Sequence, residues 1–90
     1  MNAYVVSFDT EQTSLYSAHN AITSSPSVSD WWHFLSGTYI ITSNKPQGVI
    51  DKEIKARWPG GGLLIMRATK NSSGLLPREA WDWINARITA

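Results

Sequence analysis

Asp9 is the residue whose type and position suit chemistry best. It directly follows residues 3–8, an apolar Ala-Tyr-Val-Val-Ser-Phe segment that is typical of a β-strand. Mg²⁺ keeps several water ligands and needs only one or two carboxylates, so an aspartate at a strand end can help to hold it. The bound ion could polarise a phosphate and activate water. The alternative interpretation is structural, because an aspartate here can also cap the helix that follows.

His33 is the second candidate for chemistry. Histidine changes its charge near neutral pH and can therefore act as an acid or a base. The sequence places neither a second histidine nor a carboxylate at short range that would orient the ring. A half-buried histidine at an interface is therefore the alternative. Residues 59–62, Pro-Gly-Gly-Gly, lack the Lys-Ser/Thr of a phosphate-binding loop and precede a strand, so they predict a turn.

Trp31, Trp32 and His33 begin a stretch, residues 31–42, that reads as two strands joined at Ser36-Gly37. We expect Gly37 to supply the positive φ of a tight hairpin turn. Neighbouring strand residues point to opposite faces of a sheet. Trp31 and Trp32 therefore cannot both enter one core, and one of them needs another partner.

The tryptophans of this hairpin have two interpretations. Exposed rings could stack on the bases of a single-stranded nucleic acid. They could instead pack against a second subunit, where large aromatic residues are enriched. All 8 basic residues lie at Lys45 or beyond, and phosphate contacts supply most non-specific affinity for nucleic acids. We therefore expect Trp31, Trp32 and His33 at a protein interface, with nucleic acid as the alternative partner.

Composition limits the class of protein. A chain of 90 residues makes one domain, 1–90, that can bury roughly 60–65% of its unfolded surface. The net charge of +1 argues against a polybasic membrane anchor. The chain has no cysteine and no apolar run of the length that a membrane span or signal peptide needs. A cytoplasmic protein that does not enter the membrane is the expectation.

Periodicity predicts the elements that hold these residues. We expect strands at 3–8 and 63–68, the hairpin at 31–42, and helices at 10–23, 46–58 and 77–88. In the first helix Leu15, Ala18 and Ile22 form the apolar stripe, and Asp9 or Thr10 is the expected cap. The strand at 63–68 is apolar enough to be covered on both faces. In the last helix, Trp83 is expected to pair with Arg87.

The resulting order, βαββαβ with an added C-terminal helix, predicts an α+β fold of the ferredoxin-like kind. Such a fold has a four-stranded antiparallel sheet with two helices on one face. The second face must then be covered, and either a partner chain or the last helix can do this.

The strand Tyr4-Val5-Val6-Ser7-Phe8 with Asp9 at its end resembles the CRISPR-associated Cas-two family, and the later hairpin and the Leu63-Leu64-Ile65-Met66 strand fit the same fold. The Trp-Trp-His hairpin and the tryptophan-containing last helix resemble small bacterial proteins called SinR-like. The resemblance implies a homodimer. In some members of the family two copies of the aspartate hold Mg²⁺ in a nuclease, while others are structural subunits that bind DNA.

Only Asp9 carries over from that family by position, as the candidate catalytic and metal-binding residue. Residues 23–29 contain no lysine or arginine, whereas the family commonly has a basic cluster after its first helix. The sequence thus leaves two hypotheses. One is a homodimeric Mg²⁺-dependent endonuclease acting on RNA or DNA, and the other is a non-catalytic dimerisation or protein-interaction module.

Overall fold

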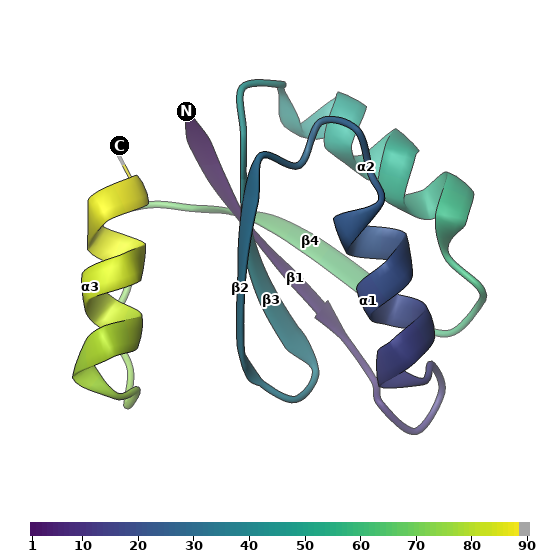
Figure 1. Cartoon of the computed structure of the whole chain (residues 1–90), viewed down its shortest axis with the longest axis horizontal. Helices are drawn as coiled ribbons and strands as arrows, with labels where there is room; N and C mark the ends of the chain where they lie inside the picture. Colours follow the sequence, from purple (N-terminus) through teal and green to yellow (C-terminus); the bar gives the residue numbers. More distant parts are fainter. Residues whose placement is uncertain (89–90) are drawn as a thin grey trace.

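Four strands and three helices follow one another in the predicted order (Figure 1). The computed structural model describes residues 1–88, and Phe34 by its backbone alone. The elements are β1 (Asn2–Phe8), α1 (Leu15–Thr23), β2 (Asp30–Leu35), β3 (Thr38–Ser43), α2 (Gln47–Arg57), β4 (Leu63–Ala68) and α3 (Arg78–Arg87).

The strands form one antiparallel sheet in the order β2-β3-β1-β4. β1 therefore lies between β3 and β4 and is hydrogen-bonded on both sides. Its alternate residues Tyr4, Val6 and Phe8 are buried on one face, as the period of two in a strand requires. The α+β class and the four-stranded antiparallel sheet are confirmed.

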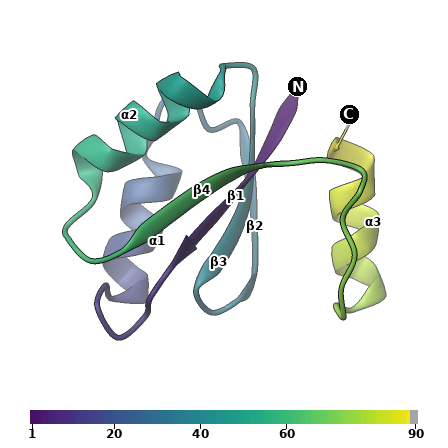
Figure 2. The same cartoon turned by 180° about the vertical axis from the view of Figure 1, so that it is seen from behind.

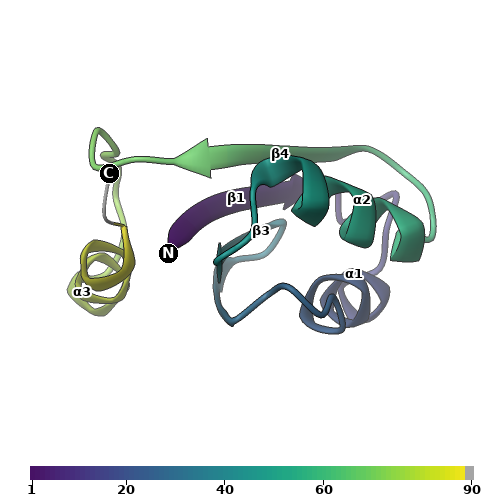
Figure 3. The same ribbon diagram turned by 90° about the horizontal axis from the view of Figure 1, so that it is seen from above.

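The helices lie in two layers, on either side of the sheet (Figures 1 and 3). α1 and α2 cover one face, where Ile22, Ile50 and Ile54 pack against the buried side chains of β1 and β3. α3 lies on the opposite face, where Ile84 and Ile88 pack against Ala3 and Ile40. The last helix is thus what covers part of the second face. Among residues 1–88, no helix combines the length and the apolar character that crossing a bilayer needs.

The first helix begins later than predicted. α1 starts at Leu15, and its N-cap is Ser14, whose Oγ accepts a hydrogen bond from the Ser17 N–H at 3.2 Å. The prediction that Asp9 or Thr10 caps this helix is wrong. The segment between β1 and α1 instead contacts the loop before β4. The Gln12 side chain accepts a hydrogen bond from Gly62 N–H, and Thr13 Oγ1 donates one to the Gly60 carbonyl.

The same contacts shape the loop before β4. Gly60 and Gly61 have φ values of +144° and +87°, a region of backbone space that glycine adopts without strain. The prediction of a turn at residues 59–62 is confirmed. Gln12 and Thr13 tie this turn to the end of β1, so residues far apart in the sequence share one end of the sheet.

Gly37 is required for a different reason from the one predicted. Its φ is not in the positive region, which Gly60 and Gly61 alone occupy among residues 1–88. A Cβ at Gly37 would instead lie 2.5 Å from the Phe8 carbonyl oxygen. The Gly37 carbonyl accepts the Phe8 N–H at 2.9 Å. The glycine is needed because the hairpin turn and the end of β1 approach each other this closely.

On its second face β4 is covered only at its end, where Ala68 packs against the core under α3, so the prediction that residues 63–68 are covered on both faces is wrong. Leu63 and Ile65 pack against the core under α1 and α2. Leu64 and Met66 point the other way and are 55% and 54% exposed. Figure 2 shows β4 running in front of β1, and the chain then continuing to α3. Because residues 63–66 are all apolar, the sequence pattern does not show which of them face the core.

Candidate functional site

Asp9 lies at the end of β1 with an exposed carboxylate. Its Oδ1 accepts a hydrogen bond from the Glu11 N–H at 2.9 Å, and its carbonyl accepts the N–H groups of Gln12 and Thr13. These contacts close a local turn. They hold the backbone of Asp9 in place and leave Oδ2 without a hydrogen bond to any described residue.

A metal site at Asp9 would need further ligand atoms close to its carboxylate. Among residues 1–88, no group of three or more His, Cys, Asp or Glu side chains lies together in a way that could hold a metal ion. One carboxylate is enough for Mg²⁺ only if water or a second chain supplies the other oxygens. Asp9 of a single chain is therefore at most half of the site that the resemblance implies.

His33 belongs to a ring cluster, which we define as His19, Trp31, His33 and Tyr39. The His33 ring stacks flat on Tyr39, with centroids 4.2 Å apart and planes 4° apart. This contact follows from the register, because His33 and Tyr39 are direct cross-strand partners in β2 and β3. His33 Nε2 lies 3.1 Å from the Ser36 carbonyl, which can only accept, so this nitrogen carries a proton.

Tyr39 joins the two histidines of the ring cluster. Its hydroxyl lies 2.7 Å from His19 Nδ1 on α1. Burial raises the pKa of the Tyr39 phenol above its ordinary value. The phenol therefore keeps its proton at neutral pH and can donate it to a neutral His19 ring. Spacing along the chain gives no sign of this His19–Tyr39 pairing, since the two residues lie on different elements.

Trp31 completes the ring cluster at the rim. It is 41% exposed and meets His19 edge to face, with ring centroids 5.0 Å apart. No carboxylate hydrogen-bonds to either histidine within residues 1–88, so neither has the acidic partner that orients many catalytic histidines. The contacts within the cluster are those that pack α1 against β2 and β3.

Trp32 lies on the opposite face, as the alternation in a strand predicts. It packs against the core under α3, with its ring centroid 6.4 Å from that of Trp83. The Arg87 guanidinium lies 4.1 Å above the Trp83 ring and pairs with Asp30 at 3.0 Å. The predicted pairing of Trp83 with Arg87 is confirmed. Both hairpin tryptophans thus have partners within the chain, and the interface role of Trp31, Trp32 and His33 stays a prediction.

α3 covers only part of the second face, for a geometric reason. A helix with its side chains is about 10 Å wide, which is less than the width of a four-stranded sheet with strands about 4.8 Å apart, so one helix leaves part of the face uncovered. The other face has two helices for its four strands. The side chains packed with α3 come from β2, β3, the start of β1 and the end of β4: Trp32, Ile40, Ala3 and Ala68.

The uncovered part of this face is what we call the open sheet surface. The registers place its members in two adjacent rows across the strands. It consists of Val5 and Ser7 of β1, Leu35 of β2, Thr38 of β3, and Leu64 and Met66 of β4. Leu35, Leu64 and Met66 are about half exposed, at 49%, 55% and 54%. None of the six side chains carries a charge.

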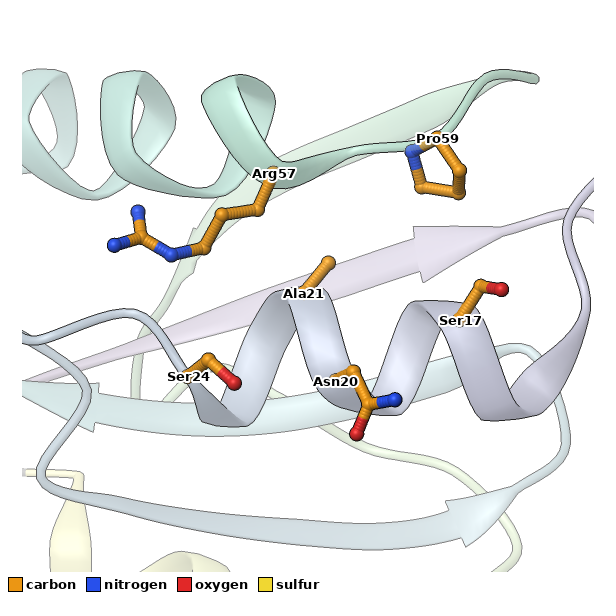
Figure 4. Close-up of a pocket in the computed structure, with 6 residues that line it drawn as sticks. All are labelled: Ser17, Asn20, Ala21, Ser24, Arg57 and Pro59. Atoms are coloured by element: carbon orange, nitrogen blue, oxygen red, sulfur yellow. The ribbon is translucent and has the colours of Figure 1, made fainter.

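A groove lies between α1 and α2. It has a volume of about 420 Å³, and Figure 4 shows Ser17, Asn20, Ala21 and Ser24 along α1, with Arg57 and Pro59 across from them. Arg57 is the one charged residue in this lining, and its Nη1 already donates to the Glu53 carbonyl at 3.0 Å. The groove offers hydrogen-bond donors but no second charged or catalytic group.

The comparisons with known proteins add no name to this arrangement. No family model, no curated protein and no solved structure matches the chain. The resemblance to the Cas-two and SinR-like proteins therefore stays a prediction. The residues that sequence reasoning missed are those of the open sheet surface. The presence of a single C-terminal helix for a face of four predicted strands was the signal that could have revealed them.

Proposed function

We propose that this chain is a ferredoxin-like protein with an added C-terminal helix, and that it acts as a non-catalytic homodimeric interaction module. The strand order β2-β3-β1-β4, with β1 in the middle, supports the first half of the proposal. The absence of cysteine suits the reducing conditions of the cytosol. The open sheet surface is the single observation that supports the second half.

Association through the face is favoured over association through the sheet edges, because both edges are modified. On β4, the Gln47 side chain donates to the Ile65 carbonyl at 3.0 Å and so occupies an outward backbone acceptor. On β2, the register shifts between His33 and Leu35 form an irregularity of the kind that disfavours strand addition. Three half-exposed apolar side chains then remain together on the face, and their burial against a partner is favourable.

A second copy of the chain is the partner that fits this face best. The open sheet surface is uncharged, so two copies can stack without removing any charge from water. α3 lies beside the open sheet surface and protrudes from the face, because a packed helix fills the layer that a second sheet would fill. In a dimer with a two-fold axis, the α3 helix of each copy would lie beside the sheet edge of the other copy. Such a contact is self-complementary.

Substitution of Leu64 by lysine tests the homodimer. In a two-fold interface each substitution occurs twice, and two buried unpaired ammonium groups are expected to raise the dimer Kd by about 100-fold or more. Sedimentation velocity over a range of concentrations measures this. The matched control is Val49→Lys on α2, where the side chain is 37% exposed outside the open sheet surface. A wild-type chain that sediments as a monomer at all concentrations would refute the proposal.

We propose Mg²⁺-dependent cleavage of RNA or DNA as a second candidate function, and the position of Asp9 favours it. Asp9 is two residues beyond Ser7 of the open sheet surface, and its carboxylate is exposed. This candidate requires that the two-fold axis of the dimer bring the two copies of Asp9 close to each other. Asp9 of each protomer would then be an Mg²⁺ ligand, and the ion when bound would polarise a phosphate and activate water.

Asp9→Asn is the informative variant for this second candidate, because the amide oxygen can still accept the Glu11 N–H. The nuclease hypothesis predicts cleavage of single- or double-stranded substrates with Mg²⁺ or Mn²⁺ that falls at least about 100-fold in the variant. Glu11→Gln is the control, since it removes a neighbouring exposed carboxylate from the same turn. Cleavage that persists in Asp9→Asn, or no cleavage by the wild type, excludes the Asp9 site.

A further inference from the structure

Met66 has a position that the proposed function does not yet explain. It lies in the open sheet surface as the cross-strand partner of Val5, and it is 54% exposed. The chain has no cysteine and two methionines, so Met66 and Met1 are its only sulfur-containing side chains. Among the members of the open sheet surface, Met66 is the one that a mild oxidant can modify.

We propose that Met66 is an oxidation site through which hydroperoxides control the association of two copies. The inference rests on the proposed homodimer. A lone pair of the thioether sulfur attacks one peroxide oxygen, so that an S–O bond forms while the O–O bond breaks. With hydrogen peroxide the leaving hydroxide takes up the proton of the oxygen now bound to sulfur and departs as water; with an organic hydroperoxide the leaving alkoxide does the same and departs as the alcohol. Sulfur is oxidised by two electrons to the sulfoxide, and the peroxide is reduced.

Methionine sulfoxide at position 66 would make the open sheet surface polar at a point that is buried in the proposed dimer. A sulfoxide is a polar acceptor on the same flexible stem, and sulfoxide formation disrupts interfaces that contain methionine. Its oxygen would be buried opposite Val5 and beside the apolar Leu64 side chain, which lies on the same face of β4. Oxidation thus weakens the dimer, and by linkage the dimer protects Met66 from oxidation.

This reciprocity gives a test with an internal control. Met1 is 53% exposed in the protomer, almost the same as Met66, and it lies outside the open sheet surface. We expect dilute hydrogen peroxide to oxidise both at similar rates when the chain is mostly monomeric. As the protein concentration rises through the dimer Kd, the Met66 rate should fall relative to the Met1 rate, as measured by peptide mass spectrometry. A rate ratio that does not depend on concentration, in a chain that does dimerise, overturns the inference.

Two variants complete the test. Met66→Leu keeps the apolar volume, so its dimer Kd should remain close to that of the wild type and stop responding to peroxide. Met66→Gln approximates the polarity of the sulfoxide and should raise the Kd at least about tenfold without any oxidant. If the wild type dimerises and full oxidation of Met66 leaves its Kd unchanged, this inference fails and the homodimer stands. If the wild type is monomeric throughout, the homodimer itself fails, and this inference with it.

Discussion

Replacement of Gly37 by alanine is expected to destabilise the fold by about 3 kcal/mol. The added Cβ would lie 2.5 Å from the Phe8 carbonyl oxygen, which is backbone and cannot rotate away. The hairpin turn must therefore move from the end of β1. That movement stretches the 2.9 Å hydrogen bond from Phe8 N–H to the Gly37 carbonyl. Leaving such a buried donor unpaired costs about 1–3 kcal/mol, before any strand distortion is counted.

Gly48→Ala is the matched control for this prediction. Gly48 lies in the first turn of α2, and a Cβ there meets no atom within 4 Å. Alanine in a helix is more favourable than glycine by about 0.5–1 kcal/mol, so this variant should be slightly more stable than the wild type. Urea unfolding followed by far-ultraviolet circular dichroism measures both. Equal effects of the two alanines would contradict the close approach at Gly37.

Trp32→Ala is expected to cost about 3 kcal/mol, whereas Trp31→Ala should cost about 1 kcal/mol. Trp32 packs between the sheet and α3, against Ile40 and Trp83, so its removal leaves a cavity under the helix. Trp31 lies at the rim of the ring cluster and is 41% exposed, so water can fill the space that it leaves. A loss of 3 kcal/mol corresponds to a fall in Tm of roughly 12–24 °C for a domain of this size.

The difference in lost stability between Trp31→Ala and Trp32→Ala compares the packing on the two faces of the sheet. Thermal unfolding of both variants, with the tryptophan fluorescence of the remaining rings as a second probe, gives the comparison. Trp32→Ala should also loosen α3, since the contact between Trp32 and Trp83 is lost while the Arg87–Asp30 pair remains. Similar losses of stability for both variants would mean that α3 adds little to the second core.

Periodicity alone predicted the order and type of the elements. Alternation in β1 placed Tyr4 and Val6 on a buried face, and the spacing of Ile84 and Ile88 gave the inner face of α3. These features are local, because a side chain's face follows from its position along a regular strand or helix. The placement of Trp31 and Trp32 on opposite faces was predictable for the same reason.

Only the tertiary structure decided how the candidate sites are built. The turn before α1 is held by Gln12 and Thr13, which bind a loop about fifty residues further along the chain. The need for a glycine at position 37 comes from β1, and the partners of His33 come from β3 and α1. Each of these contacts joins residues that are distant in sequence, so no local pattern encodes them.

The sequence by itself determined that this is an α+β chain with more apolar sheet surface than two helices can cover. It left open which part of that surface is covered, because a continuous run such as Leu63-Leu64-Ile65-Met66 reads the same whether one face is buried or both. The place where α3 packs decided the matter: it covers Ala68 at the end of β4 and leaves Leu64 and Met66 exposed beside Val5. The open sheet surface is therefore a property of the packed layers.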